Sequence, residues 1–352
     1  MPVDPIDLPT GALRRRLVTV PVLYAAWVVC LALLPVLAVL ALVVDGCRRA
    51  RGVPTIRLVG FAAVYLSYEA AGVLAAAWLW ITRPVRPATW AARNRRLQHW
   101  WTNGLVRAAG PVLGLRIQLE IEAQGAGGDS GAFSHRPVIV LSRHVSILDS
   151  LLPAYVLGVG QGRHLRYVLT KGLRLDPCLD IVGHRLPNHF VDRGASDTTA
   201  DLAALGRLGR DLGPEGAVVV FPEGGLFTPE RRDRALARLE AGGSPRVEVA
   251  AGLRRLLPPR PAGTLALLAA APDADVVVFA HDGFEPLGSL KRLWRVLPMT
   301  EPVRLRLVYH PRAGVPDDDA ARIIWLDEQW ASMDRWLVGA PARAGTGPSA
   351  AA

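Results

Sequence analysis

Cysteine and lysine are scarce in this chain. Its 352 residues include three cysteines, Cys30, Cys47 and Cys178, and two lysines, Lys171 and Lys291. The cysteines lack the spacing of metal-binding motifs and one lies in an apolar run, so we expect no disulfide framework and a reducing compartment. Arginine carries nearly all of the basic excess, a formal charge of +10. That charge suits nucleic acid, anionic lipid or phosphate-bearing ligands, and does not choose among them.

Charge is absent from a long segment near the N-terminus. Residues 17–44 contain no charged side chain and exceed the ~20 residues needed to cross a bilayer. Residues 58–81 form a second apolar run, with Glu69 as its one charge. The first run is too long for the core of a cleaved signal peptide. We therefore expect a membrane helical hairpin at 17–81, preceded by a flexible leader at 1–16.

The loop between the two apolar runs is strongly basic. It holds Arg48, Arg49, Arg51 and Arg57. If both helices crossed the bilayer, this loop would lie opposite the rest of the chain, against the positive-inside tendency. A hairpin that dips into one leaflet avoids the conflict. Both arrangements stay open; we expect the cell membrane as the location, with the remainder of the chain on the cytoplasmic face.

Residues 82–111 mix arginines with tryptophans. Trp90, Leu97, Trp101 and Leu105 recur at helical spacing and give an apolar stripe flanked by arginines. Such a helix either lies at the membrane interface facing anionic headgroups or packs on the next domain. Its position directly after the hairpin favours the first interpretation, so this segment is expected to be an interfacial amphipathic linker.

From residue 112 onward, short β-type runs alternate with helical segments. Strands are predicted at 116–122, 138–141, 164–169, 190–192, 217–220, 276–280 and 304–309, and helices at 150–157, 198–212 and 317–337. This alternation indicates an α/β fold with a mixed, largely parallel sheet flanked by helices. We expect the domain to cover residues 112–340, followed by a disordered small-residue tail at 341–352.

The clearest candidate for chemistry follows a predicted buried strand. His144 emerges at the carboxyl end of that strand, where open α/β sheets place their sites, and Asp149 comes five positions later. Because residues five apart on a helix point ~140° away from each other, His144 must lie in the turn and Asp149 at the helix start for the two to meet. The carboxylate would then orient the ring of a general base. Alternatively, Ser146 and Asp149 form a capping box that only closes the helix.

Two further strand ends carry residues suited to a phosphate or a polyol. Glu223 and Gly224 follow another buried run, where glycine lets backbone N–H groups approach an anion and the carboxylate can accept hydrogen bonds from hydroxyls. Arg193 follows a short strand and could bind a phosphate through its bidentate guanidinium. A plain turn and a surface Asp192–Arg193 pair are the simpler alternatives.

Taken together and in this order, these segments resemble the four blocks of the glycerolipid acyltransferase family, which includes lysophosphatidic acid acyltransferases. His144 and Asp149 match the His-x-x-x-x-Asp catalytic block. The second block is matched by Phe190, Asp192 and Arg193, and the segment that leads into it by Lys171, Pro177 and Gly183. The third block is matched by residues 221–224. The fourth block is matched by residues 256–260, Gly263 and the strand at 276–280. The fourth block, with Phe227, Thr228 and residues 325–337, is similar to the branch typified by lysocardiolipin and lysophosphatidylinositol acyltransferases.

The resemblance implies an acyltransferase acting at a membrane. His144, oriented by Asp149, would take the proton from a lysophospholipid hydroxyl, such as that of 1-acyl-glycerol-3-phosphate, as its oxygen attacks the thioester of acyl-CoA or acyl-carrier protein. Backbone N–H groups near the catalytic turn would stabilise the oxyanion. The residues expected to bind the acceptor are Lys171, Arg193, Glu223, Gly224 and Arg143. Membrane lipids are expected partners, whereas no metal, other cofactor or nucleic acid is expected.

The sequence departs from the family pattern at two places. Gly225-Leu226 stand where the family usually has Thr-Arg, and Arg143 replaces a common Asn, so the headgroup specificity is expected to differ from that of the best-known members. One alternative function is a metal-dependent phospholipid hydrolase, with ligands drawn from His144, Asp149, Asp192, Glu223, His281 and Asp282, although the histidines lack the spacing of ligand pairs. Another is a catalytically inactive membrane lipid-binding protein, against which the intact His144–Asp149 pair argues.

Overall fold

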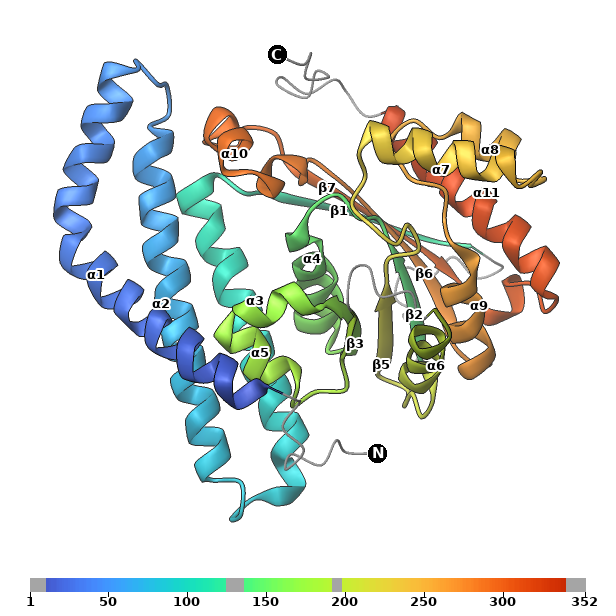
Figure 1. Ribbon diagram of the computed structural model, residues 1–352, viewed down its shortest axis with the longest axis horizontal. Helices are drawn as coiled ribbons and strands as arrows, with labels where there is room; N and C mark the ends of the chain where they lie inside the picture. The colour runs from blue at the N-terminus through green and yellow to red at the C-terminus, as the bar shows by residue number, and fades with distance from the viewer. Residues whose placement is uncertain (1–10, 125–135, 192–197, 340–352) are drawn as a thin grey trace. The chain divides into compact units, whose positions relative to one another are not determined.

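The computed structural model describes residues 11–124, 136–191 and 198–339 (Figure 1). The chain forms two compact units by packing. The first unit comprises Met1–Leu115, Leu151–Asp201 and Leu297–Thr300, and the second comprises Arg116–Ser150, Leu202–Val296 and Glu301–Ala352. These units are defined by contacts between residues and do not test the domain boundaries predicted from the sequence. Those boundaries stay predictions.

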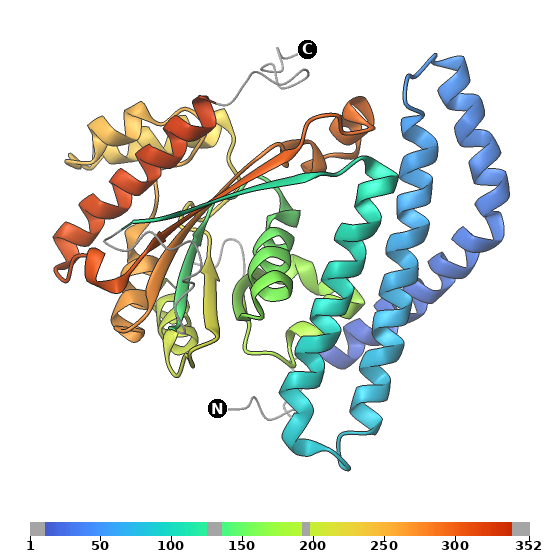
Figure 2. The same cartoon turned by 180° about the vertical axis from the view of Figure 1, so that it is seen from behind.

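Two long helices dominate the first unit. Helix α1 spans Ala12–Cys47 and α2 spans Pro54–Ile81, and they run side by side in both views (Figures 1 and 2). Both are long and apolar enough to cross a membrane, a test that core helices and signal sequences also pass. In the most apolar window of α1 only 6% of residues are buried, against 28% in α2. Such extensive exposed apolar surface suits lipid or a protein partner better than water.

Helix α1 begins earlier than the uncharged run suggested. Residues 14–16, expected in a flexible leader, are helical because two of them have partners elsewhere in the first unit. Arg15 and Arg16 pair with the fully buried carboxylate of Asp180 at 2.6 and 2.7 Å. Asp180 lies in α5 (Pro177–Gly183). The helix therefore includes residues 12–16 of the predicted leader, since a contact so distant in sequence leaves no local pattern.

A buried acid joins the two long helices at their connecting loop. Asp45, near the end of α1, accepts hydrogen bonds from the backbone N–H groups of Thr55 and Ile56 in the first turn of α2. The first N–H groups of a helix have no partner within it, so this carboxylate supplies what the chain itself lacks there. Pro54 begins α2 at a position where no N–H is needed.

Helix α3 (Trp90–Leu113), preceded by the short turn η1 (Pro87–Thr89), carries the arginine-flanked stripe. All four apolar residues of that stripe are buried. Leu97, Trp101 and Leu105 belong to one core cluster with Val73 of α2 and Val182 of α5. The stripe therefore faces protein, which favours the alternative of packing on a neighbouring part of the chain, and a place for this helix at the membrane interface stays a prediction. An amphipathic pattern records that one face is apolar and does not record what covers that face.

The rest of the first unit is built from short elements. They are α4 (Leu151–Pro153), η3 (Ala154–Val159), β3 (His164–Thr170), η4 (Lys171–Leu175), α5 and β4 (His189–Val191). Strands β3 and β4 pair in parallel, with Leu169 opposite Phe190. Asp176 caps α5 by accepting a hydrogen bond from the N–H of Leu179.

The second unit is built on a sheet. Its strands are β1 (Ile117–Ala123), β2 (Val138–Ser142), β5 (Gly216–Val220), β6 (Asp275–Asp282) and β7 (Val303–His310), in the order β1-β7-β6-β2-β5. Every pair is parallel except β6 with β7. The expected α/β fold with a mixed, largely parallel sheet is confirmed. Strands β2, β5 and β6 are buried throughout, which explains why their sequences are continuous apolar runs.

Helices pack on this sheet and connect its strands. They are η2 (Ile147–Ser150), most of α6 (Thr198–Gly209), α7 (Pro229–Ala241), α8 (Val247–Gly252), α9 (Pro261–Ala270), η5 (Glu285–Gly288), α10 (Leu290–Val296), η6 (Arg312–Gly314) and α11 (Asp319–Val338). Helix α9 contacts β2, and α11 contacts β6. Because β2, β5 and β6 run in the same direction, their carboxyl ends meet at one edge, and the candidate site lies there.

Candidate active site

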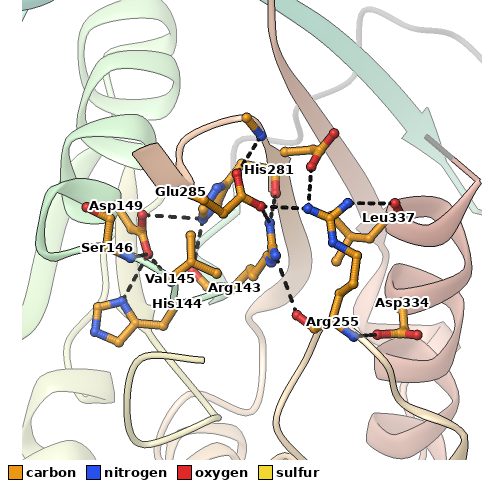
Figure 3. Close-up of polar contacts among 12 residues, drawn as sticks. Arg143, His144, Val145, Ser146, Asp149, Arg255, His281, Glu285, Asp334 and Leu337 are labelled. Atoms are coloured by element: carbon orange, nitrogen blue, oxygen red, sulfur yellow. Dashed lines mark hydrogen bonds and ion pairs between the residues drawn. The ribbon is translucent and has the colours of Figure 1, made fainter. Parts of the chain in front are cut away.

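His144 and Asp149 meet as the sequence predicted. Strand β2 ends at Ser142, so His144 lies in the turn that follows, and Asp149 lies in η2. The ring Nδ1 of His144 is 3.1 Å from Oδ2 of Asp149 (Figure 3). The carboxylate is fully buried, whereas the imidazole side chain keeps 13% of its surface exposed. A buried carboxylate facing Nδ1 favours the tautomer with a proton there, which leaves Nε2 free to accept another proton.

Asp149 also holds the turn itself. Its Oδ2 accepts hydrogen bonds from the backbone N–H groups of Val145 and Ser146. The hydroxyl oxygen of Ser146 in turn accepts from the N–H of Leu148. The capping and the ring-orienting interpretations therefore coexist in one carboxylate. Because these N–H groups point at Asp149, the oxyanion would need donors other than Val145 and Ser146.

Glu223 braces the turn that holds His144 from the neighbouring strand. It follows β5, which pairs in parallel with β2. One carboxylate oxygen accepts a hydrogen bond from the backbone N–H of His144 at 2.8 Å, and the other accepts from Leu257 at 2.9 Å. The side chain is buried, and this burial raises its pKa to about 8. Because both oxygens of this buried carboxylate accept backbone hydrogen bonds, the expected contact between Glu223 and substrate hydroxyls is disfavoured. That contact stays a prediction.

The loop around Glu223 contacts His144 at two further points. The ring of Phe221 stacks on the imidazole, with centroids 4.4 Å apart and planes inclined by 30°. The N–H of Phe227 donates to the His144 carbonyl at 2.8 Å. Gly224 has a φ of +65°, and a Cβ there would come within 3.0 Å of the Arg260 side chain. Glycine is therefore required at this turn for its backbone conformation and for space.

Arg143 points into the protein. Its side chain is 1% exposed and donates to the carbonyl of His281 at 2.6 Å and to Glu285 at 2.8 Å (Figure 3). Burial by itself would raise the pKa of Glu285, but the neighbouring charges, Arg143 first, lower it to about 2. Arg255 joins the same carboxylate and pairs with Asp282. The expected contact of Arg143 with the acceptor is disfavoured by this geometry and stays a prediction.

The structure does not test whether the two predicted phosphate ligands, Lys171 and Arg193, reach this site. Lys171 begins η4 at the end of β3, in the first unit, and its side chain is partly buried. Arg193 and Asp192 lie outside the described residues. Their roles as phosphate contacts stay predictions.

Sequence reasoning missed the groups behind the catalytic pair. His281 and Glu285 enter the site from the carboxyl end of β6 and from η5. His281 had been considered only as a metal ligand. The sequence held a signal for His281, because this residue directly follows the apolar run at 276–280. His144 and Glu223 also come soon after apolar runs, those that end near Ser142 and Val220. What the sequence could not supply is that β6 lies directly beside β2.

The metal-hydrolase alternative finds no ligand cluster in the described part of the chain. Within residues 11–124, 136–191 and 198–339, no group of three or more His, Cys, Asp or Glu side chains could hold a metal ion. Both oxygens of Glu223 accept backbone N–H groups, and Asp282 pairs with Arg255. These candidate ligands therefore already have protein partners.

The matched region of a known protein family includes this site. Residues 127–278 match the family model described as Acyltransferase, a stretch that contains His144, Asp149 and Glu223. No curated protein matches the chain. Among solved structures, the chain is similar to the 1-acyl-sn-glycerophosphate (LPA) acyltransferase PlsC from Thermotoga maritima, with 12% identity, coverage of 78% of this chain and 100% of that chain, and a TM-score of 0.41. The family match supports an acyltransferase over the matched residues.

Proposed function

We propose that this protein transfers a fatty acyl group from a thioester, acyl-CoA or acyl-carrier protein, to the free hydroxyl of a lysophospholipid such as 1-acyl-glycerol-3-phosphate. The observation that carries the proposal is the His144–Asp149 pair at the edge of the sheet. Its buried carboxylate faces Nδ1, and the partly exposed ring keeps Nε2 available. This is the arrangement that a general base requires.

The reaction needs one proton transfer in each direction. Nε2 of His144 takes the hydroxyl proton while the hydroxyl oxygen attacks the thioester carbonyl, and Asp149 stabilises the imidazolium that forms. The tetrahedral oxyanion then collapses, the carbon–sulfur bond breaks, and the leaving thiolate takes the proton back from the imidazolium. The products are the phospholipid ester and a free thiol. No acyl-enzyme, metal or other cofactor takes part in this scheme.

Acceptor binding is proposed to use two kinds of residue. Lys171 and Arg193 would bind the phosphate, since both have long basic side chains that can donate hydrogen bonds to phosphate oxygens. Gly224 would let the backbone approach the glycerol. Arg143 and Glu223, which are buried, would act by holding the catalytic turn in place.

The membrane is the proposed source of the acceptor. Helices α1 and α2 would keep the enzyme at the cell membrane, where both long-chain substrates partition, with the second unit on the cytoplasmic face. The exposed apolar side chains of α1 support this location. Whether the hairpin spans the bilayer or dips into one leaflet is tested below.

A product analysis tests the function. Purified protein is incubated with mixed lysophospholipids and acyl-CoA, and separately with acyl-carrier protein, and the lipids are identified by mass spectrometry. Diacyl phospholipid formed by the wild-type protein and not by His144→Ala supports the proposal. Release of free fatty acid or headgroup that stops on metal chelation would favour the hydrolase. No turnover with either donor across the acceptor panel would favour a lipid-binding protein.

A further inference from the structure

A second histidine lies behind the catalytic pair. His281 is the penultimate residue of β6, which pairs in parallel with β2 so that Phe279 is opposite Ser142. Arg143 and His144, the two residues that follow Ser142, therefore lie beside the end of β6. The His281 side chain is fully buried (Figure 3). A buried histidine needs a reason to be there, because an apolar side chain would fill the same space without desolvating a polar ring.

The contacts of His281 are directed at the catalytic turn. Its Nε2 lies 3.2 Å from the backbone carbonyl oxygen of Arg143 and 3.7 Å from Oδ1 of Asp149. The Arg143 guanidinium donates back to the carbonyl of His281 at 2.6 Å. Oδ1 of Asp149 has no hydrogen-bond partner within the described part of the chain. His281 therefore faces the oxygen of the catalytic carboxylate that the His144 ring does not use.

One peptide group receives support at both of its ends. The carbonyl of Arg143 and the N–H of His144 belong to the same peptide bond. His281 lies at the carbonyl, where the Ser142 hydroxyl also donates at 3.3 Å, and Glu223 accepts from the N–H at 2.8 Å. Because a peptide group is planar, fixing both ends fixes its rotation. The plane sets the position of the His144 Cα, from which the side chain extends toward Asp149.

A neutral ring is sufficient for this contact, because only its Nε2–H is needed. Burial lowers the pKa of His281, with Arg143 lowering it further and the carboxylates of Asp149 and Glu285 acting in the opposite direction. Arg255 and Asp282 complete the charged groups around this network. A neutral ring with its proton on Nε2 can donate to the Arg143 carbonyl, while Nδ1 has no hydrogen-bond partner among the described residues.

We propose that His281 is a positioning residue for the transfer reaction: its Nε2–H holds the Arg143–His144 peptide and faces Asp149, so that the His144 ring stays aligned with its carboxylate. This inference rests on the proposed function for its kinetic consequence. Its structural consequence, the tautomer of His144, does not depend on any substrate. The two can therefore be measured separately.

The test compares three substitutions at one position with a matched control. His281→Phe removes the donor and keeps most of the volume, whereas His281→Gln places an amide N–H near the position of Nε2. His281→Asn is a second loss variant, polar but too short to reach the carbonyl, in case the phenylalanine variant does not fold. The control is His310→Phe, since His310 is also buried and belongs to the same sheet, but pairs with Val276 at the other end of β6.

Two readouts are expected to agree. His281→Phe and His281→Asn should lower kcat at least tenfold with little change in either KM, while His281→Gln and His310→Phe stay within about threefold of wild type. Nitrogen-15 NMR of histidine-labelled protein should show His144 with its proton on Nδ1 in wild type, His281→Gln and His310→Phe, and a mixture of tautomers in the two loss variants.

The outcomes separate the inference from the function on which it rests. If the wild-type protein transfers no acyl group, the proposed function fails, and the NMR comparison still decides the role of His281. If the folded loss variants keep the kcat and the His144 tautomer of the His310→Phe control, the inference is overturned. It is also overturned if His281→Gln, folded and stable, loses as much activity as His281→Phe.

Discussion

Apolar residues of the same types have opposite environments in the two units. In α1, Leu17 and Val22 expose 66% and 61% of their surface, whereas Val140 and Leu141 of β2 expose none. Strands β2, β5 and β6 of the second unit are buried along their whole length. Many apolar side chains of α1 are exposed instead, which in water would be unfavourable. The buried strands therefore form a core, whereas the exposed surface of α1 suits a non-aqueous neighbour.

Buried polar groups also serve different ends in the two units. In the first unit, Glu69 of α2 accepts hydrogen bonds from the Trp101 indole at 2.7 Å and from the Cys178 backbone at 3.3 Å, and so ties three helices together. In the second unit, Glu223 and His281 converge on the peptide next to the catalytic histidine. Substitutions in the first unit should therefore alter stability, and those around the turn should alter chemistry.

The largest effect is expected at His144. His144→Ala should lower the transfer rate by roughly 10²- to 10⁴-fold, the usual contribution of a positioned general base. The melting temperature and membrane binding should be unchanged, because the ring is partly exposed and makes few contacts. Turnover is measured on purified protein, and membrane binding by flotation with vesicles. Near wild-type turnover would show that His144 is not the base.

Asp149→Asn should lower both activity and stability. The amide cannot accept from His144, Val145 and Ser146 as the carboxylate does, so we expect at least about a 10²-fold loss of turnover and about 1–3 kcal/mol of unfolding free energy. A role in capping alone would cost about 1 kcal/mol and leave catalysis largely intact. Comparing melting temperature with turnover in this variant decides between the two.

His310 should make the second unit sensitive to acid. Burial lowers its pKa to about 4, below the ordinary 6.5. As the pH falls from 6.5, the unfolded chain therefore takes up the proton first, and stability decreases until about pH 4; by linkage the loss is roughly 3 kcal/mol. His310→Phe should remove this component. The melting temperature in detergent is measured for both proteins from pH 4 to 7, and a constant difference between them would contradict the prediction.

Glu69→Ala should destabilise the first unit without altering the chemistry. It leaves the Trp101 indole and the Cys178 N–H without their acceptor, at a cost of about 1–3 kcal/mol. Glu69→Gln keeps an acceptor for Trp101 and should lose less. The melting temperature reports the effect, and kcat measured well below the melting temperature should stay near wild type. A loss of kcat with unchanged stability would contradict the assignment of Glu69 to stability and not to chemistry.

The smallest perturbation is a label on the loop of the hairpin. We expect the loop at 47–57 and the catalytic residues to lie on the same, cytoplasmic side, because Glu69 and the arginines of the loop disfavour a crossing hairpin. Cys47 is exposed and can be labelled once Cys30 and Cys178 are replaced.

A membrane-impermeant maleimide should leave Cys47 unlabelled in intact cells and label it after the membrane is opened. The matched control is the same protein with Cys47→Ser, which should stay unlabelled in both conditions. Labelling in sealed cells would show that the hairpin crosses the bilayer. The function proposed for the second unit would then stand with a different topology.

Local sequence patterns determined much of this protein. The runs of apolar residues gave the two long helices and the buried strands within a few residues of their ends, because a helix or strand repeats its environment at a fixed period. The spacing of His144 and Asp149 around a strand end predicted their meeting, since both lie in one turn. Helices α7 to α10 were not predicted; α8, α9 and α10 have ten residues or fewer, whereas α7 has 13 and could have been recognised.

Tertiary structure alone decided which polar residues face inward. Arg143 and Glu223 were expected to contact substrate, yet each is buried against partners far along the chain, Glu285 and Leu257. The stripe on α3 was expected at a membrane surface and is covered by α2 and α5. Periodicity records which side of an element is apolar or charged. The neighbour of that side depends on strand order and helix packing, which join residues so distant in sequence that no local pattern records them.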